Sequence, residues 1–143
     1  MIRIACFTAA GILALSLSAG ATAAEQKSLY DRLGGKPALT AVVNEMWAVV
    51  SADTRINARF ANTKPEAFGG KLVDFLCQAS GGPCQYQGKD MKAAHAGMNV
   101  SEAEFNALAE DTVKVLDKFK VPETEKNEVM GLLGSLKGDV INH

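Results

Sequence analysis

The sequence predicts an all-α fold in one domain, and three observations support this prediction. Apolar residues recur at steps of three and four in several segments, which is the spacing of one helix face. No segment alternates apolar and polar residues in the way of a half-buried strand. The length of 143 residues suits one domain, and only 4 prolines interrupt the chain. We therefore expect helices packed in layers around one core.

Composition excludes several other classes of protein. The 15 basic residues (Lys and Arg) nearly balance the 16 acidic residues, so the chain lacks the basic excess of a nucleic-acid-binding domain. The 48% hydrophobic content and the small net charge are not those of a disordered chain. We expect a folded domain with no nucleic-acid partner.

The first 24 residues have the layout of a secretory signal peptide. Met1–Arg3 is a short positive start, residues 4–17 are apolar, and the small residues 19–24 suit a cleavage site. The apolar stretch is shorter than the roughly 20 residues that a membrane span needs. We expect residues 1–24 to be removed, with residues 25–143 exported to the periplasm and no stable membrane span left. An uncleaved anchor helix is the alternative.

The first two helices are expected on either side of a glycine pair. Leu29, Tyr30 and Leu33 indicate a short helix that ends at Gly34-Gly35. Pro37 then suits the first turn of a second, longer helix, which closes at residues 51–53. Its apolar stripe consists of Leu39, Val42, Val43, Met46, Trp47 and Val50.

The middle of the chain predicts a helix, a loop and a helical turn. Pro65 begins the helix, and Gly81-Gly82-Pro83 ends it because proline and glycine interrupt helices. Gln85 to Lys89 form a polar loop. The buried face of the helix comprises Phe68, Leu72, Phe75, Leu76 and Ala79, and Phe60 lies in the connecting segment before it. One side of the helical turn comprises Met91, Ala94, His95 and Met98.

Two further helices complete the domain, giving five or six in all. Ser101 and Glu104 form the capping-box pattern S-E-A-E at the start of one helix, and Val121-Pro122 ends it. Thr124 is expected to cap the last helix. The apolar faces comprise Phe105, Leu108, Thr112, Val115, Leu116 and Phe119 in the first, and Val129, Leu132, Leu133, Leu136 and Val140 in the second.

Two cysteines, Cys77 and Cys84, follow the expected signal peptide. In one continuous helix their Cα atoms would be roughly 10 Å apart, too far for a disulfide. The Gly81-Gly82-Pro83 segment between them breaks the helix and provides a turn that could join the sulfurs, as an oxidising compartment would favour. The alternative is that both pack as small apolar side chains.

His95 is the candidate for chemistry. The other histidine, His143, is the terminal residue, and chain ends are rarely ordered. His95 lies on the same apolar side as Met91 and Met98, where an imidazole needs a partner. That partner is either a backbone carbonyl, in a purely structural role, or a ligand.

Several site classes are disfavoured by the absence of their motifs. Zinc needs three or four protein ligands, whereas the chain offers His95 and two cysteines that would be oxidised. The sequence contains no G-x-S-x-G elbow, G-x-G-x-x-G motif or P-loop. It also lacks C-x-x-C-H, the attachment motif of c-type haem. A single imidazole among apolar helices suits a non-covalently held haem.

Three segments resemble the truncated haemoglobins of group I. The run L-Y-D-R-L-G-G at 29–35 is similar to the opening of that family. Residues 75–91 read F-L-x-x-x-x-G-G-P-x-x-Y-x-G-x-D-M, and residues 91–100 read M-x-x-A-H-x-G-M-x-V. The resemblance extends over about residues 29–140 and places His95 at the position of the proximal haem ligand.

The resemblance implies a two-over-two helical sandwich that holds haem b, with His95 binding the iron. Phe60 matches the aromatic residue that packs on the haem face, and Tyr86 and Lys71 are candidates for the propionate edge. The other positions that match haem-contacting residues are Phe68, Leu72, Leu76, Met91, Val100, Phe105, Leu108 and Val129.

The distal side departs from the family pattern. Where the family usually has a tyrosine, this chain has Trp47, and the facing positions are Phe68 and Leu72. Indole has one N–H donor, and the other two side chains have none, so we expect fast O2 release unless Trp47 reaches the ligand rather than packing as wall. Lys71 either pairs with a propionate or, when neutral, supplies a sixth iron ligand.

The resemblance implies that the protein binds a diatomic gas: O2, NO or CO. Gas transport, NO scavenging, sensing and electron transfer are all compatible with such a site, and some of these roles require a reductase. We expect at most weak NO dioxygenase activity, because the distal side is apolar, and at most weak peroxidase-like activity, because the distal side lacks an acid or base. The alternative from a different class is a haem-free helical module that binds an apolar ligand or a partner.

Overall fold

The computed structural model describes residues 26–141, so the expected signal peptide and His143 lie outside the described residues. The all-α prediction is confirmed within this range, which contains helices and no strand. The helices are α1 (Leu29–Leu33), α2 (Gly35–Ala52), the 3₁₀ helix η1 (Asn57–Phe60), α3 (Pro65–Ala79), α4 (Met91–His95), α5 (Glu102–Lys118), α6 (Glu123–Ser135) and α7 (Lys137–Val140).

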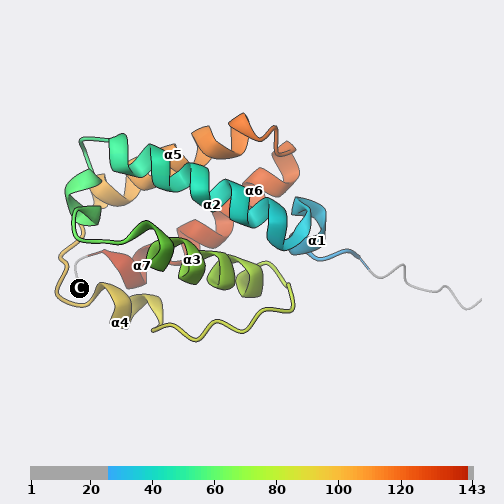
Figure 1. Ribbon diagram of the computed structural model, residues 1–143, viewed down its shortest axis with the longest axis horizontal. Helices are drawn as coiled ribbons and strands as arrows, with labels where there is room; N and C mark the ends of the chain where they lie inside the picture. Colours follow the sequence, from blue (N-terminus) through green and yellow to red (C-terminus); the bar gives the residue numbers. More distant parts are fainter. Residues whose placement is uncertain (1–25, 142–143) are drawn as a thin grey trace, which may run out of the picture.

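The four longest helices follow one another in two consecutive pairs: α2 leads to α3 through residues 53–64, which include η1, and α5 leads to α6 through residues 119–122. Helix α2 packs against both α3 and α5, while α6 packs against α5 and α1. Helix α4 follows a long loop after α3 and packs chiefly against α7, as seen at the lower left of Figure 1. None of the helices between residues 26 and 141 is long and apolar enough to cross a membrane.

The start of the fold follows its local sequence closely. The Ser28 hydroxyl accepts a hydrogen bond from the Asp31 N–H at 3.1 Å and so caps α1. Gly34 ends α1 at a φ of +97°, and Gly35 begins α2 at +73°. Side chains other than glycine rarely adopt this left-handed conformation, which explains why a glycine pair separates the two helices.

The predicted capping box at the start of α5 is confirmed and carries an additional ion pair. Glu104 accepts from the Ser101 N–H at 2.8 Å, and Ser101 accepts from the Glu104 N–H at 3.2 Å. Arg59, in η1, donates to Glu104 at 2.6 Å and to the Met98 carbonyl at 2.7 Å. These bonds fasten the segment before α3 to the turn between α4 and α5.

The C-terminal part differs from the sequence prediction in two respects. Helix α6 begins at Glu123 with Pro122 at its N-cap, so Thr124 lies inside the helix and does not cap it. The predicted last helix is also divided, because the Leu136 N–H bonds to the Leu133 carbonyl, a tighter turn than an α-helix makes. Helix α7 is a separate helix that packs against α4. The described residues therefore contain seven α-helices, whereas the sequence predicted five or six.

Two clusters of buried side chains form the core. The first joins α2 to α5 and comprises Met46, Val50, Ile56, Ala107 and Val115, with Phe60 and Leu108 packed against it. The second comprises Val100, Phe105 and Val140, with Met91, Leu133, Leu136 and Ile141 packed against it. Met91 is the first residue of α4, so the second cluster supports the helix that carries His95.

The two cysteines form a disulfide, which settles the alternative that the sequence left open. Cys77 lies near the end of α3, and Cys84 lies in the loop that follows. Helix α3 stops at Ala79, before Gly81-Gly82-Pro83, and the chain turns back. As a result the two Cα atoms are 5.7 Å apart, within the range for a disulfide.

The ion pair of Glu104 with Arg59 should make the free energy of unfolding fall in acid. The Arg59 hydrogen bond, followed by bonds from Ser101, lowers the pKa of Glu104 from 4.5 to about 2. Because the folded-state pKa lies below the unfolded value, this contribution is complete above about pH 4.5 and is lost as the pH falls toward 2. Glu104→Gln should therefore flatten the pH dependence of the unfolding free energy in this window, as measured by urea denaturation.

Glu66→Gln is the matched control, because the Glu66 carboxylate makes no ion pair with any residue in the described range. It should leave the acid dependence unchanged. Equal slopes for Glu104→Gln and the wild type would contradict the role of the Arg59–Glu104 pair.

Candidate functional site

His95 is the last residue of α4, and a hydrogen bond fixes the orientation of its ring. Asp90 caps this short helix by accepting from the Ala93 N–H at 2.7 Å. The His95 Nδ1 lies 2.7 Å from the Met91 carbonyl oxygen, one turn earlier. A carbonyl only accepts, so Nδ1 carries a proton, and in the neutral imidazole Nε2 then keeps a lone pair. This arrangement prepares the imidazole to bind a metal through Nε2.

Any metal held by His95 would need most of its ligands from elsewhere. Within residues 26–141 no group of three or more His, Cys, Asp or Glu side chains could hold a metal ion. A porphyrin supplies four nitrogen ligands of its own, so it requires only one from the protein. A half-buried imidazole whose Nδ1 is held by a carbonyl therefore fits haem better than a bare ion.

Three aromatic side chains from different elements form a cluster beside α3. The Trp47 ring centre lies 5.3 Å from that of Phe68 and 6.2 Å from that of Phe60. Phe60 and Phe68 are 5.6 Å apart and nearly perpendicular. In the described part of the chain the Trp47 indole N–H has no hydrogen-bond partner. The cluster presents flat apolar surface and a single unused donor.

Comparisons with known proteins identify the family to which these features belong. A sequence model of the bacterial-like globins matches residues 28–142. The chain is 33% identical over 117 residues to a group 1 truncated hemoglobin of Mycolicibacterium paratuberculosis, covering 82% of this chain and 86% of the relative. It is 32% identical over 115 residues to one of Tetrahymena pyriformis, covering 80% and 95%. The chain belongs to the truncated haemoglobins.

Solved structures of truncated haemoglobins share the fold. The Fe(III) form of the Tetrahymena pyriformis protein aligns with a TM-score of 0.78 at 32% identity, covering 82% of this chain and all of that one. The 2/2 hemoglobin of Synechococcus, solved in the cyanomet state with covalently attached heme, aligns with a TM-score of 0.77 at the same identity and coverage. The predicted two-over-two sandwich is confirmed. Membership of the globin family makes haem b the cofactor and a diatomic gas the ligand.

The structure brings many of the predicted haem-contacting residues of this truncated haemoglobin into two groups. Trp47, Phe60 and Phe68 form the aromatic cluster described above, and Leu72 follows Phe68 by one turn on α3. Other predicted positions gather in the core: Met91, Val100 and Phe105 in the second cluster, and Leu108 against the first. Their contact with haem stays a prediction.

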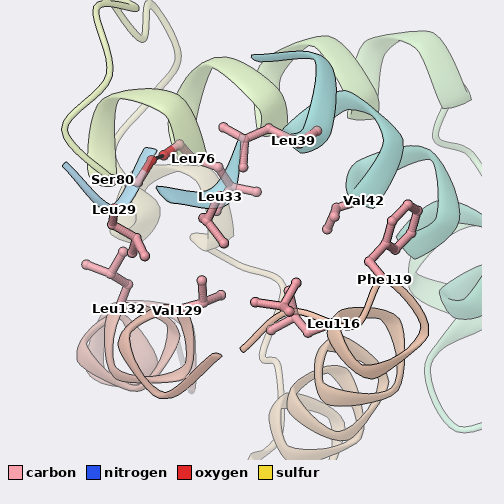
Figure 2. Close-up of a pocket in the computed structure, with 12 residues that line it drawn as sticks. Leu29, Leu33, Leu39, Val42, Leu76, Ser80, Leu116, Phe119, Val129 and Leu132 are labelled. Carbon is pink, nitrogen blue, oxygen red and sulfur yellow. Dashed lines mark hydrogen bonds between the residues drawn. The ribbon is translucent and has the colours of Figure 1, made fainter. Parts of the chain in front are cut away.

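Two further predicted positions, Leu76 and Val129, line a separate apolar cavity of about 150 Å³. Figure 2 shows their side chains pointing into it together with Leu39 of α2 and Leu116 of α5. Ser80, the polar member of the lining, donates its hydroxyl to the Leu76 carbonyl at 2.6 Å. The surface of this cavity is thus apolar, with its hydroxyl already satisfied.

The two candidates for the propionate edge differ in their availability. The Tyr86 hydroxyl donates to the Lys89 carbonyl at 3.0 Å, and its ring packs on Phe75 with centres 5.3 Å apart. Lys71 is exposed and forms no ion pair with another residue of the described range. Lys71 is therefore the freer of the two to meet a carboxylate.

Arg59 is a contributor to this site that sequence reasoning missed. It holds the carbonyls of Met98 and Asn99, the residues just after the His95 turn, at 2.7 and 3.4 Å. The only sequence signal was a basic residue next to Phe60, and such a signal does not reveal a contact across 40 positions of the chain.

The aromatic cluster predicts a stability difference between two substitutions of Trp47. Full burial of Trp makes its replacement by alanine cost about 3–5 kcal/mol; because Trp47 is half-buried, we expect Trp47→Ala to cost about 2 kcal/mol. Trp47→Phe keeps an aromatic face and should cost about 1 kcal/mol or less. Urea denaturation of the haem-free protein measures both. Equal costs would show that the ring contacts contribute nothing.

Proposed function

We propose that this protein binds haem b through His95 and takes up NO or CO, with O2 held weakly, in an exported compartment. The observation that carries the proposal is the 2.7 Å hydrogen bond from the His95 Nδ1 to the Met91 carbonyl. It leaves Nε2 as an available ligand on a helix that begins against an apolar core cluster. When bound, haem supplies an iron centre that reversibly takes a diatomic gas.

The choice of gas follows from the distal side chains. Trp47, Phe60 and Phe68, which match distal positions, pack on one another as aromatic carbon, and the Leu72 side chain has no polar atom. O2 bound to ferrous haem would gain partial negative charge, so its affinity depends on a hydrogen-bond donor beside it. The affinities for NO and CO depend less on such a donor. A distal side with a single indole donor therefore supports scavenging or sensing of NO or CO over O2 storage or dioxygenase work.

One feature of the sequence and one of the structure support an exported location. Residues 1–24 have the layout of a signal peptide, and the Cys77–Cys84 disulfide is the oxidised form that exported proteins keep. Gas binding by ferrous iron also requires an electron donor, so the proposal includes a reductase or a small reductant as a partner in that compartment.

Replacement of His95 tests the haem site directly. His95→Ala should abolish the Soret absorption band of the purified protein, and added imidazole should restore it because a free ligand can fill the vacated position. Trp47 is the single tryptophan of the chain, so quenching of its fluorescence during haem titration gives a second readout.

Lys64→Ala is the control for this experiment and should retain the Soret band, because Lys64 is exposed and is not among the predicted haem-contacting positions. A wild-type protein that stays colourless after expression with ample haem would contradict the proposal and favour a haem-free helical binding module.

A tyrosine at position 47 should slow O2 release. Trp47→Tyr exchanges the indole N–H for a phenol hydroxyl, the donor that the family usually has at this position, and a hydrogen bond from it to O2 would be worth about 1.4 kcal/mol, or about tenfold. We therefore expect the O2 dissociation rate of Trp47→Tyr to be about tenfold below that of the wild type, in stopped-flow measurements on the ferrous protein. The CO dissociation rate should change much less. Trp47→Phe is the apolar control, and an unchanged O2 rate in Trp47→Tyr would show that position 47 does not reach the ligand.

A further inference from the structure

The Cys77–Cys84 disulfide joins the distal helix to the loop that leads to His95. Cys77 is fully buried in the last turns of α3. Cys84 lies in the segment between α3 and α4, which has no regular secondary structure apart from turns. The bond therefore holds the beginning of the segment whose end carries the proximal histidine.

The surroundings of the disulfide are tightly packed on the side of α1. A Cβ atom placed on Gly82 would lie 2.6 Å from the Tyr30 ring and 2.7 Å from the Cys77 sulfur, so only glycine fits there. The Tyr30 N–H also donates to the Ser80 carbonyl at 2.9 Å. The turn between the two cysteines is thereby clamped between α1 and the disulfide.

Order continues from Cys84 toward α4. The Tyr86 N–H donates to the Gln78 side-chain oxygen at 2.7 Å, and the Tyr86 ring packs on Phe75, so both contacts return to α3. The Tyr86 hydroxyl then donates to the Lys89 carbonyl, immediately before the Asp90 cap of α4. These contacts order the loop from Cys84 to Lys89, which directly precedes the Asp90 cap of α4.

Helix α4 needs such support because it has little of its own. It spans 5 residues, none of which is fully buried, and a helix of this length is not stable alone. On the far side of His95, Arg59 holds the Met98 and Asn99 carbonyls. The position of His95 is thus set by one anchor on each side, and the disulfide is the covalent part of the upstream anchor.

We propose that the Cys77–Cys84 disulfide is a positioning element for the proximal ligand and controls how firmly the protein retains haem. This inference rests on the proposed function, in which His95 binds haem. An added dithiol reduces the disulfide: the S–S bond breaks, and Cys77 and Cys84 each gain a proton and an electron. The dithiol is oxidised to a cyclic disulfide in the same reaction. Loss of the bond then loosens the segment from residue 85 to His95.

Amide hydrogen exchange tests the positioning itself, without any haem. In the haem-free protein, Cys77→Ala/Cys84→Ser and dithiol-treated wild type should both exchange faster at residues 85–95 than the oxidised wild type. The buried amides of α5 at residues 105–116 serve as the internal reference and should change little. Equal exchange rates at residues 85–95 in all three samples would overturn the proposal.

Haem transfer to an excess of a haem-scavenging apoglobin tests the consequence. We expect the double variant and the dithiol-treated wild type to lose haem about tenfold faster than the oxidised wild type, as expected when support around a metal ligand is removed. Leu39→Ala is the control for general destabilisation, because Leu39 is buried on α2, is not a predicted haem-contacting position, and lines a cavity whose lining does not include His95.

The outcomes of these experiments separate the two proposals. The positioning role would be overturned if the rate of haem loss depended on the melting temperature alone. In that case Leu39→Ala would lose haem as fast as the double variant when the two melting temperatures are equal. A wild type without a Soret band would contradict the proposed function instead, and hydrogen exchange would still decide whether the disulfide orders the His95 segment.

Discussion

The hydrogen bond between the His95 Nδ1 and the Met91 carbonyl is the interaction on which the site depends. At 2.7 Å it selects one tautomer of the imidazole, orients the ring along α4, and leaves Nε2 available for the metal that we propose His95 binds. A histidine free to rotate, or protonated at the other nitrogen, would present no lone pair in a fixed direction. The rest of the fold serves to keep this short segment in place.

That constraint explains why polar and covalent contacts concentrate around a helix with no fully buried residue. Met91 packs on the second core cluster, Arg59 holds the turn after His95, and the disulfide with Tyr86 holds the loop before it. Trp47, Phe60 and Phe68 pack on one another through their rings, and Phe60 also packs against the first core cluster. The proposed proximal side is thus held by directed bonds, and the proposed distal side by apolar packing.

Local signals in the sequence were sufficient for much of this structure. The apolar stripe of α2, Pro65 at the start of α3 and the capping box at Ser101 each act within a few residues, and each is confirmed. The break at Leu136 and the bonds of Arg59 depend on segments distant in sequence, so no local pattern revealed them. The same holds for Leu76 of α3 and Val129 of α6, which line a common cavity although they are far apart in the sequence.

The account is tested most directly by resonance Raman spectroscopy of the ferrous protein grown with ¹⁵N-labelled histidine. It predicts an iron–imidazole stretching band in the unliganded ferrous state that shifts to lower frequency with the isotope and disappears in His95→Ala. A ferrous spectrum that shows no isotope-sensitive band, or one that persists unchanged without the His95 ring, would contradict the assignment of this imidazole as the ligand that holds the haem.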